Sequence, residues 1–254
     1  MRIPFRHAFR FALSLGALGV GTGASADPGE ALGSGLALAA PHADAAVLDL
    51  AAHALSCAER EQLVSNTQIL SVIDYSRPST EPRLWVFDLA HRKLLFEELV
   101  AHGKNTGDNR ALRFSNAPGS LMSSIGVFLT ADTYVGHNGY SLRLRGLEPG
   151  FNDRALERDI VVHGASYVDS GAVALLGRLG RSFGCPAVRP AIAHRLIDTI
   201  RDGSLLVAYY PDQRWLQGST LVHGCTAAPQ ALAAQRDSIT DLPDPSRAIA
   251  ASPR

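Results

Sequence analysis

The sequence predicts a mainly β fold, a sandwich or barrel with a few peripheral helices. Short β-prone runs follow one another at hairpin-like intervals between residues 69 and 163, and glycines punctuate them. No helix alternates with these runs, which argues against a parallel doubly wound sheet. The chain has 254 residues, of which 46% are hydrophobic, enough for one sizeable domain with extensions.

Residues 1–26 have the three-part pattern of a secretory signal peptide. Three arginines precede the short apolar run 11–20, and small residues at 24–26 precede Asp27. The run is shorter than the roughly 20 residues that span a bilayer. We therefore expect export to the periplasm or the extracellular space, with no stable membrane span after processing. A retained anchor or a transit sequence is the alternative.

The next segments are interpreted as a linker and a helix. Residues 27–41 are rich in Ala, Gly and Leu, carry two prolines, and are typical of a linker. Residues 42–66 form an N-terminal helical segment, because apolar residues recur at helical spacing between 47 and 58 and Asp44 suits its N-cap.

The strands are expected next, followed by one helix and a last strand. Pro190 suits the first turn of that helix, its apolar stripe runs to Ile200, and Gly203 ends it. Residues 226–254 are rich in proline and polar residues and predict a mobile C-terminal extension. The expected strands are 69–75, a hairpin of 84–89 and 94–100, then 126–130, 133–136, 140–144, 159–163 and 204–210.

The chain has three cysteines, Cys57, Cys185 and Cys225, an odd number for an exported protein. A disulfide between Cys57 and Cys225 would tie the two ends of the domain and leave Cys185 as a free thiol. A disulfide that includes Cys185 is the alternative, and it would remove the thiol.

Cys185 lies between Gly184 and Pro186, a combination that suits a sharp, fixed turn presenting the side chain. Pro186 has no N–H, so the local backbone donors for an oxyanion are Gly184 and Cys185. An inert cysteine buried in a tight turn is the alternative interpretation.

His163 ends an alternating apolar strand, and Gly164 leaves room beside its ring. A histidine of this kind can act as the base that turns a thiol into a nucleophile. No nearby acid is a convincing partner for its second nitrogen, so a backbone carbonyl is expected there. A histidine with only a structural role at the edge of the sheet is the alternative.

Further polar residues follow strands or glycines. His102 and His137 could join His163 and Cys185 as metal ligands, but their spacing matches no zinc signature, so we expect no metal and no cofactor. A zinc carboxypeptidase is the weaker alternative. Asn116 lies in a Gly- and Ser-rich loop that could line a groove for a polar peptide. Formal net charge is zero, which gives no argument for nucleic acid.

The histidine and cysteine segments carry a resemblance. His163-Gly164 followed by Ser182-Phe183-Gly184-Cys185 resembles the signature of the murein L,D-transpeptidase catalytic domain family, and the resemblance covers about residues 67–211. We therefore expect the catalytic domain over 67–225. Further matching segments are 100–104, 114–116, 123–126, 141–148 and 180–182.

The resemblance implies an exported enzyme that acts on peptidoglycan stem peptides. Cys185 would be the nucleophile and His163 its general base, and a thioacyl-enzyme would form on the third residue of a tetrapeptide stem. An amine acceptor would give a 3→3 cross-link, and water an L,D-carboxypeptidase. A catalytically silent wall-binding module is the other alternative. Five residues are predicted to contact substrate: Ser182, Arg181, His102, Gly164 and Asn116.

Two positions depart from the commoner pattern of the resembled family. Phe183 stands where a histidine usually precedes the Gly-Cys pair. Ala187 stands where an arginine or asparagine often follows the cysteine, and Arg189 lies two residues further on. These differences bear on recognition of a substrate carboxylate, for which Arg178 and Arg181 beside the cysteine loop are candidates.

Overall fold

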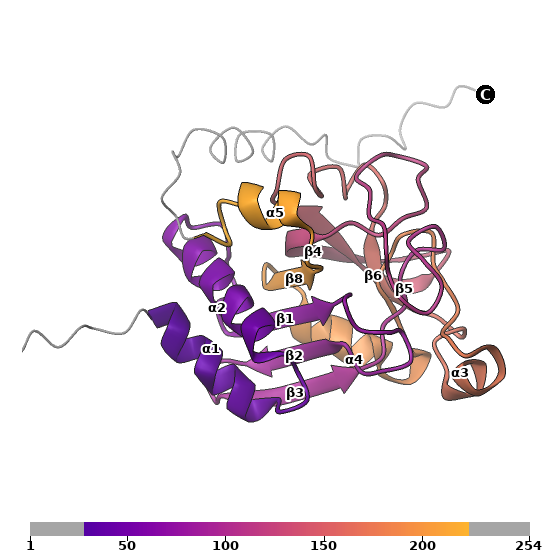
Figure 1. Cartoon of the computed structure of the whole chain (residues 1–254), viewed down its shortest axis with the longest axis horizontal. Coiled ribbons are helices and arrows are strands. Elements are labelled where there is room, and N and C mark those ends of the chain that lie inside the picture. Colours follow the sequence, from indigo (N-terminus) through magenta and orange to yellow (C-terminus); the bar gives the residue numbers. More distant parts are fainter. Residues whose placement is uncertain (1–27, 224–254) are drawn as a thin grey trace, which may run out of the picture.

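The computed structural model describes residues 28–223, which form eight strands and five helices (Figure 1). The helices are α1 (Pro28–Ala39), α2 (Ala45–Arg60), α3 (Ser170–Leu176), α4 (Pro190–Ile200) and α5 (Gln213–Gly218). The strands are β1 (Ile69–Asp74), β2 (Leu84–Asp88), β3 (Lys93–Glu98), β4 (Gly126–Gly136), β5 (Gly139–Gly146), β6 (Val161–Gly164), β7 (Ala187–Val188) and β8 (Leu205–Tyr209).

All eight strands belong to one sheet of order β3-β2-β1-β8-β4-β5-β6-β7. The last strand in the chain, β8, is central, because it pairs in parallel with β1 and antiparallel with β4. The segment after β3 then meets β7 at the far edge, where the N–H of Ala101 donates to the carbonyl of Ala187 at 2.8 Å. The sheet is therefore a nearly closed barrel, which confirms the mainly β prediction.

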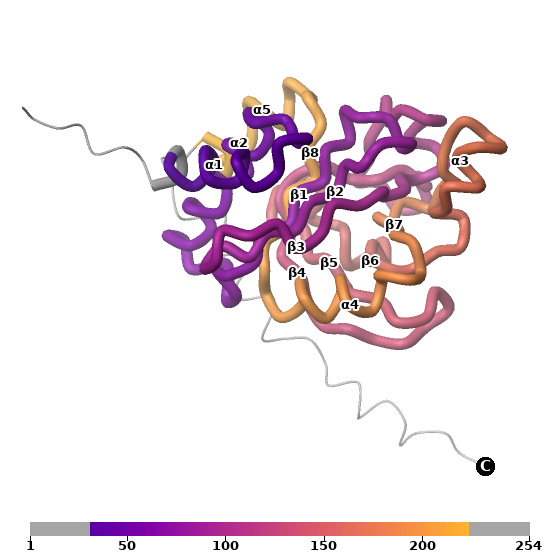
Figure 2. The backbone as a smooth tube through the Cα atoms, turned by 90° about the horizontal axis from the view of Figure 1, so that it is seen from below, coloured from indigo at the N-terminus to yellow at the C-terminus, as the bar shows by residue number. Residues whose placement is uncertain are grey.

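The central strand β8 is apolar along its whole length because both faces of the sheet are covered there. In β1, Leu70 and Val72 belong to the cluster that includes α2, whereas Ile73 belongs to the cluster that includes α4. Figure 2 shows α1, α2 and α5 gathered at one end of the molecule and α3 at the other. No helix within residues 28–223 has the length and apolar character needed to cross a membrane.

The linker predicted over 27–41 is wrong, because residues 28–39 form α1 beside α2. Leu32 and Leu36 lie one helical turn apart and pack against the α2 cluster. Gly33 permits this close approach, since a Cβ built there would lie 2.8 Å from the Cα of Asp49. The Ala- and Gly-rich composition that suggests a linker is in fact the composition of a closely packed helical hairpin.

Most other predicted elements are confirmed. Asp44 caps α2 by accepting the N–H of Ala46 at 2.9 Å, and β2 and β3 form the expected hairpin. Pro190 opens α4. The two runs predicted at 126–130 and 133–136 are one strand, β4, with an irregularity between Thr130 and Thr133. The elements α3, α5 and β7 have no sequence prediction, and the predicted segments 1–26 and 226–254 lie outside the described residues.

Candidate active site

A cavity of about 220 Å³ lies where the β4–β5 hairpin, β6 and the cysteine loop meet. It brings together four of the predicted catalytic or substrate-contacting residues, Cys185, His163, Ser182 and Arg181, and does not include His102, Gly164 or Asn116. The remaining lining residues are His137, Asn138, Tyr167 and Phe183.

Sheet pairing brings His163 and Cys185 to the same cavity. His163 lies in β6, which pairs in parallel with the short strand β7, and its partner there is Ala187. Cys185 precedes Ala187 by two residues on that neighbouring chain segment. Cys185 therefore lies next to Val161, two residues before His163 on β6, and the side chains of Cys185 and His163 line one cavity although they are 22 positions apart in the sequence.

His163 is held in the form that a general base requires. Its Nδ1 lies 3.0 Å from the carbonyl oxygen of Gly164, so Nδ1 carries the proton and donates it to this bond. Burial lowers the pKa of His163 below its usual 6.5, and the Gly164 carbonyl opposes this only in part. The neutral imidazole therefore keeps its Nε2 lone pair free to accept a proton. A backbone carbonyl fills the orienting role expected for it.

Cys185 is a free, buried thiol in its protonated form. Burial raises its pKa, while the N–H of Val161 and the guanidinium of Arg158 act in the opposite direction. Its Sγ lies 3.5 Å from the carbonyl oxygen of Asp159, to which it donates, and 3.5 Å from the N–H of Val161. Asp159 has a left-handed backbone (φ 51°), an uncommon conformation for a residue other than glycine. The resting thiol needs a base to become a nucleophile.

The cysteine loop is fixed by a short chain of hydrogen bonds. Ser182 Oγ donates to the carbonyl of Cys185 at 2.6 Å and accepts the N–H of Gly184 at 3.1 Å. Ser123 Oγ donates to the carbonyl of Gly184 at 2.9 Å. Gly184 itself has φ 131°, a conformation that favours glycine.

These bonds correct the predicted pair of oxyanion donors. The N–H of Gly184 is already used by Ser182, so it does not point at a substrate oxygen. The N–H of Cys185 interacts with its own sulfur and makes no hydrogen bond to another residue within 28–223. Of the two predicted donors, Cys185 is the one left available.

Two residues near the thiol, Arg158 and Tyr167, are not predicted as site residues by the sequence. Arg158 is half-buried and donates four hydrogen bonds to the 115–124 loop, including one of 2.6 Å to the carbonyl of Met122. Tyr167 lines the cavity, and burial, reinforced by the charge of a Cys185 thiolate, raises its pKa to about 12. Arg158 therefore brings a fixed positive charge, and Tyr167 a hydroxyl that stays protonated.

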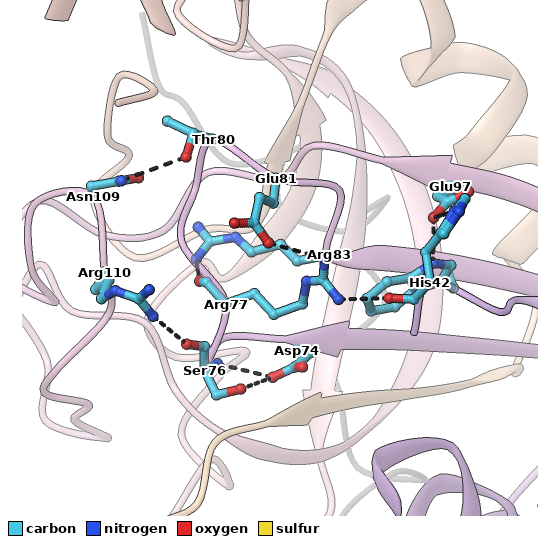
Figure 3. A network of polar contacts seen from close by, with 11 residues as sticks. His42, Asp74, Ser76, Arg77, Thr80, Glu81, Arg83, Glu97, Asn109 and Arg110 are labelled. Atoms are coloured by element: carbon cyan, nitrogen blue, oxygen red, sulfur yellow. Dashed lines mark hydrogen bonds and ion pairs between the residues drawn. The ribbon is translucent and has the colours of Figure 1, made fainter. Parts of the chain in front are cut away.

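His102 lies beneath the site rather than in it. It is 1% exposed, its Nδ1 accepts from Arg83 Nη2 at 2.8 Å, and its Nε2 donates to the carbonyl of Gly107 at 3.3 Å. Burial and the Arg83 charge lower its pKa to about 4. Figure 3 shows the buried Arg83, whose Nη1 donates to the carbonyl of Arg77 at 2.9 Å. With both ring nitrogens used, His102 supports the loop that precedes the site.

The other predicted contacts are also occupied elsewhere. Asn116 donates to Asp153 at 2.7 Å and accepts the N–H of Arg154 at 3.2 Å, which joins two surface loops. Gly164 lets α4 approach, because a Cβ there would lie 2.9 Å from the Cβ of Ala193. Within residues 28–223, no cluster of three or more His, Cys, Asp or Glu side chains is arranged to hold a metal ion.

Cys57 is the described half of the predicted disulfide. Cys57 is disulfide-bonded, whereas Cys185 is free as predicted. The sulfur of Cys57 lies 3.8 Å from the carbonyl oxygen of Thr220, five residues before Cys225 in the sequence. Cys225 itself lies outside the described residues, so the Cys57–Cys225 pairing stays a prediction.

A barrel that presents a cysteine and a neutral histidine to one cavity has the arrangement of a thiol-dependent transferase or hydrolase. The family model of the L,D-transpeptidase catalytic domain matches residues 39–209. The chain therefore belongs to the L,D-transpeptidase catalytic domain family, which confirms the resemblance in its sequence. The match begins before α2, so the N-terminal helical segment is part of the family domain.

Solved structures with low identity accompany this match. An L,D-transpeptidase from Mycobacterium smegmatis is 13% identical over 56% of this chain and 59% of that chain, with a TM-score of 0.36. L,D-transpeptidase 1 from Mycobacterium tuberculosis is 13% identical over 56% and 62%, with a TM-score of 0.32. One from Stackebrandtia nassauensis is 12% identical over 73% and 92%, with a TM-score of 0.35. This chain thus aligns with less than two thirds of the two mycobacterial proteins. No curated protein matches it.

Proposed function

We propose that the chain is an exported, cysteine-dependent L,D-transpeptidase that acts on peptidoglycan tetrapeptide stems through a thioacyl-enzyme on Cys185. The observation that carries the proposal is the pairing of a free thiol with a neutral His163 in one cavity, the histidine being oriented by the Gly164 carbonyl. Membership of the L,D-transpeptidase family supplies the substrate class. Export rests on the three-part pattern of residues 1–26.

The first half-reaction forms the thioester. His163 Nε2 takes the proton from Cys185 Sγ, and the thiolate attacks the carbonyl carbon of the third stem residue. The oxyanion of the tetrahedral intermediate forms beside the N–H of Cys185, and such a donor typically lowers the barrier by roughly 3–4 kcal/mol. The intermediate collapses when the C–N bond breaks, and the leaving D-alanine amine takes the proton back from His163.

The second half-reaction releases the acyl group. An amine of another stem attacks the thioester carbonyl, and His163 accepts its proton. The C–S bond breaks, the product amide carries the 3→3 cross-link, and Cys185 recovers its proton from His163. Water in place of the amine would give the L,D-carboxypeptidase product by the same steps.

The decisive experiment is mass spectrometry of the full chain incubated with a tetrapeptide stem. We expect an adduct of the stem minus D-alanine on the unsubstituted chain and none on Cys185→Ala. His163→Ala should keep its fold and acylate ~10²–10⁴-fold more slowly. An equal adduct on Cys185→Ala would refute the assignment of the nucleophile.

The same samples separate the alternatives. Muropeptide products show whether the acyl acceptor is an amine, a D-amino acid or water. A chain that binds stems but never forms an adduct would support the silent wall-binding module. Loss of activity with a chelator would instead support the zinc carboxypeptidase.

A further inference from the structure

A second, more open cavity adjoins the candidate active site. It has a volume of about 410 Å³ and shares Arg181 with the cavity that contains Cys185. Lys104 also lines it, with its Nζ 4.7 Å from the ring centroid of Phe183, which lines the first cavity. Arg181 and the Lys104–Phe183 pair therefore form the boundary between the two cavities. The two cavities therefore lie side by side.

This second cavity, called here the basic pocket, is strongly cationic. Its charged lining consists of Lys104, Arg110, Arg113 and Arg181 with the single acid Asp108, a formal net charge of +3. The whole chain has a formal net charge of zero, so the excess of positive charge is confined to this part of the surface. Like charges gathered on one concave surface repel one another and attract an anion.

Only one of the four cations is neutralised. Asp108 pairs with Arg181 Nη1 at 2.8 Å. No ion pair joins Lys104, Arg110 or Arg113 to a carboxylate in the part of the chain that the structure describes. Arg110 donates to the carbonyl of Ser76 at 3.3 Å, as Figure 3 shows, and keeps its charge. Three positively charged residues without a carboxylate partner among the described residues therefore line an open cavity.

The cations are held on a loop that is tied to the cysteine loop. The N–H of Lys104 donates to the carbonyl of Ser182 at 2.8 Å, and the N–H of Arg113 donates to the carbonyl of Thr106 at 3.0 Å. Thr106 is fully buried, and its Oγ1 accepts the N–H of Ser123 at 2.8 Å. A ligand held by this loop is thus fixed relative to Cys185, and little backbone ordering is needed on binding.

We propose that the basic pocket binds a free carboxylate of the acyl-donor stem while its third residue lies at Cys185. This inference rests on the proposed function and assigns a subsite to it. A tetrapeptide stem carries a free carboxylate on its terminal D-alanine, beside the bond that is cleaved, and another at the end of the diaminopimelate side chain. The donor is the stem whose third residue lies at Cys185, and the basic pocket shares Arg181 with the cavity of Cys185, so it is the donor that can reach both.

Binding measurements with the Cys185→Ala chain test the subsite without catalysis. We expect the tetrapeptide stem to bind ~10-fold more weakly when Arg113→Gln is added, and more weakly again when Lys104→Gln is added as well. The affinity of these variants for the stem should also depend less on salt concentration. Arg214→Gln, an exposed arginine on α5, is the matched control and should change nothing. Unchanged melting temperatures of the variants show that they fold.

Amidated stems identify the carboxylate. One arm carries an amide on the terminal D-alanine and the other an amide on the diaminopimelate side chain, and we expect one of them to lose affinity and its dependence on Arg113. The subsite is overturned if the charge variants bind the tetrapeptide stem as tightly as the Cys185→Ala chain does and if that chain binds a stem amidated at both positions equally well. It is also overturned if the Cys185→Ala chain binds no stem. Acylation of the unsubstituted chain by the tetrapeptide is scored separately, so the two proposals fail by different measurements.

Discussion

Replacing His102 by asparagine should make the fold markedly less sensitive to acid. His102 is buried beneath the site, accepts a hydrogen bond from Arg83 and has a pKa of about 4 in the folded chain, against 6.5 when exposed. Asparagine keeps an oxygen that can accept from Arg83 but cannot take up a proton in this range.

The direction follows from proton linkage. A histidine whose pKa is lowered by folding is neutral in both states above pH 6.5, where its contribution to stability is complete. Between pH 6.5 and pH 4 the unfolded chain gains a proton that the folded chain does not, so stability falls as pH falls. For a pKa lowered from 6.5 to about 4, the loss between pH 7 and pH 5 is about 2 kcal/mol, approaching about 3 kcal/mol below pH 4.

Urea unfolding of the purified chain at pH 7 and at pH 5 measures this loss. The change in unfolding free energy between the two pH values should be about 2 kcal/mol smaller for His102→Asn than for the unsubstituted chain. Other titrating groups are the same in both proteins, so their contributions cancel in the difference. His91→Asn, at an exposed surface position, is the control. Equal pH dependence in all three proteins would refute the assignment of a neutral, buried His102.

Three further predictions follow from the site and from the helical hairpin. Arg158→Gln should raise the pKa of the Cys185 thiol, seen as a rightward shift in the pH dependence of iodoacetamide alkylation, and an unshifted curve would contradict an electrostatic role. Burial lowers the pKa of His163, so the acid limb of kcat/KM should lie below pH 6.5, and a limb at or above this value would argue against a neutral base. Gly33→Ala should destabilise by about 1–3 kcal/mol because its Cβ meets α2, whereas Gly35→Ala, which meets nothing within 4 Å, should stabilise by about 0.5–1 kcal/mol; equal effects on urea unfolding would disprove the close packing.

Local sequence patterns were sufficient for the elements that are fixed by burial. The run ending at Tyr209 is apolar throughout because β8 is covered on both faces, so its sequence predicts a buried strand. Its central place between β1 and β4 depends on pairing across the whole chain, and no local pattern records it. The linker prediction for the Ala- and Gly-rich α1 was wrong because the small residues that let it pack on α2 also occur in linkers.

The candidate site shows the same limit. His102 and His163 both end apolar runs and precede glycine, and the sequence treats them alike. Because the barrel closes, His163 faces the cavity, whereas His102 is buried against Arg83. Arg158 reaches the thiol region from a loop between β5 and β6, and no motif in the sequence marks it.

The closing contact of the barrel has a consequence for how the molecule loses function. The site is built where the segment after β3 meets the cysteine loop and β7, and the hydrogen bonds there include those from Ala101 to Ala187, from Ser182 to His102 and from Lys104 to Ser182. Local opening of this contact would separate the loop of Cys185 from its support while β1, β8 and β4 stay paired. Amide hydrogens at these three donors should therefore exchange faster than those of β8, and the enzyme should lose its active geometry by a local event before its core unfolds.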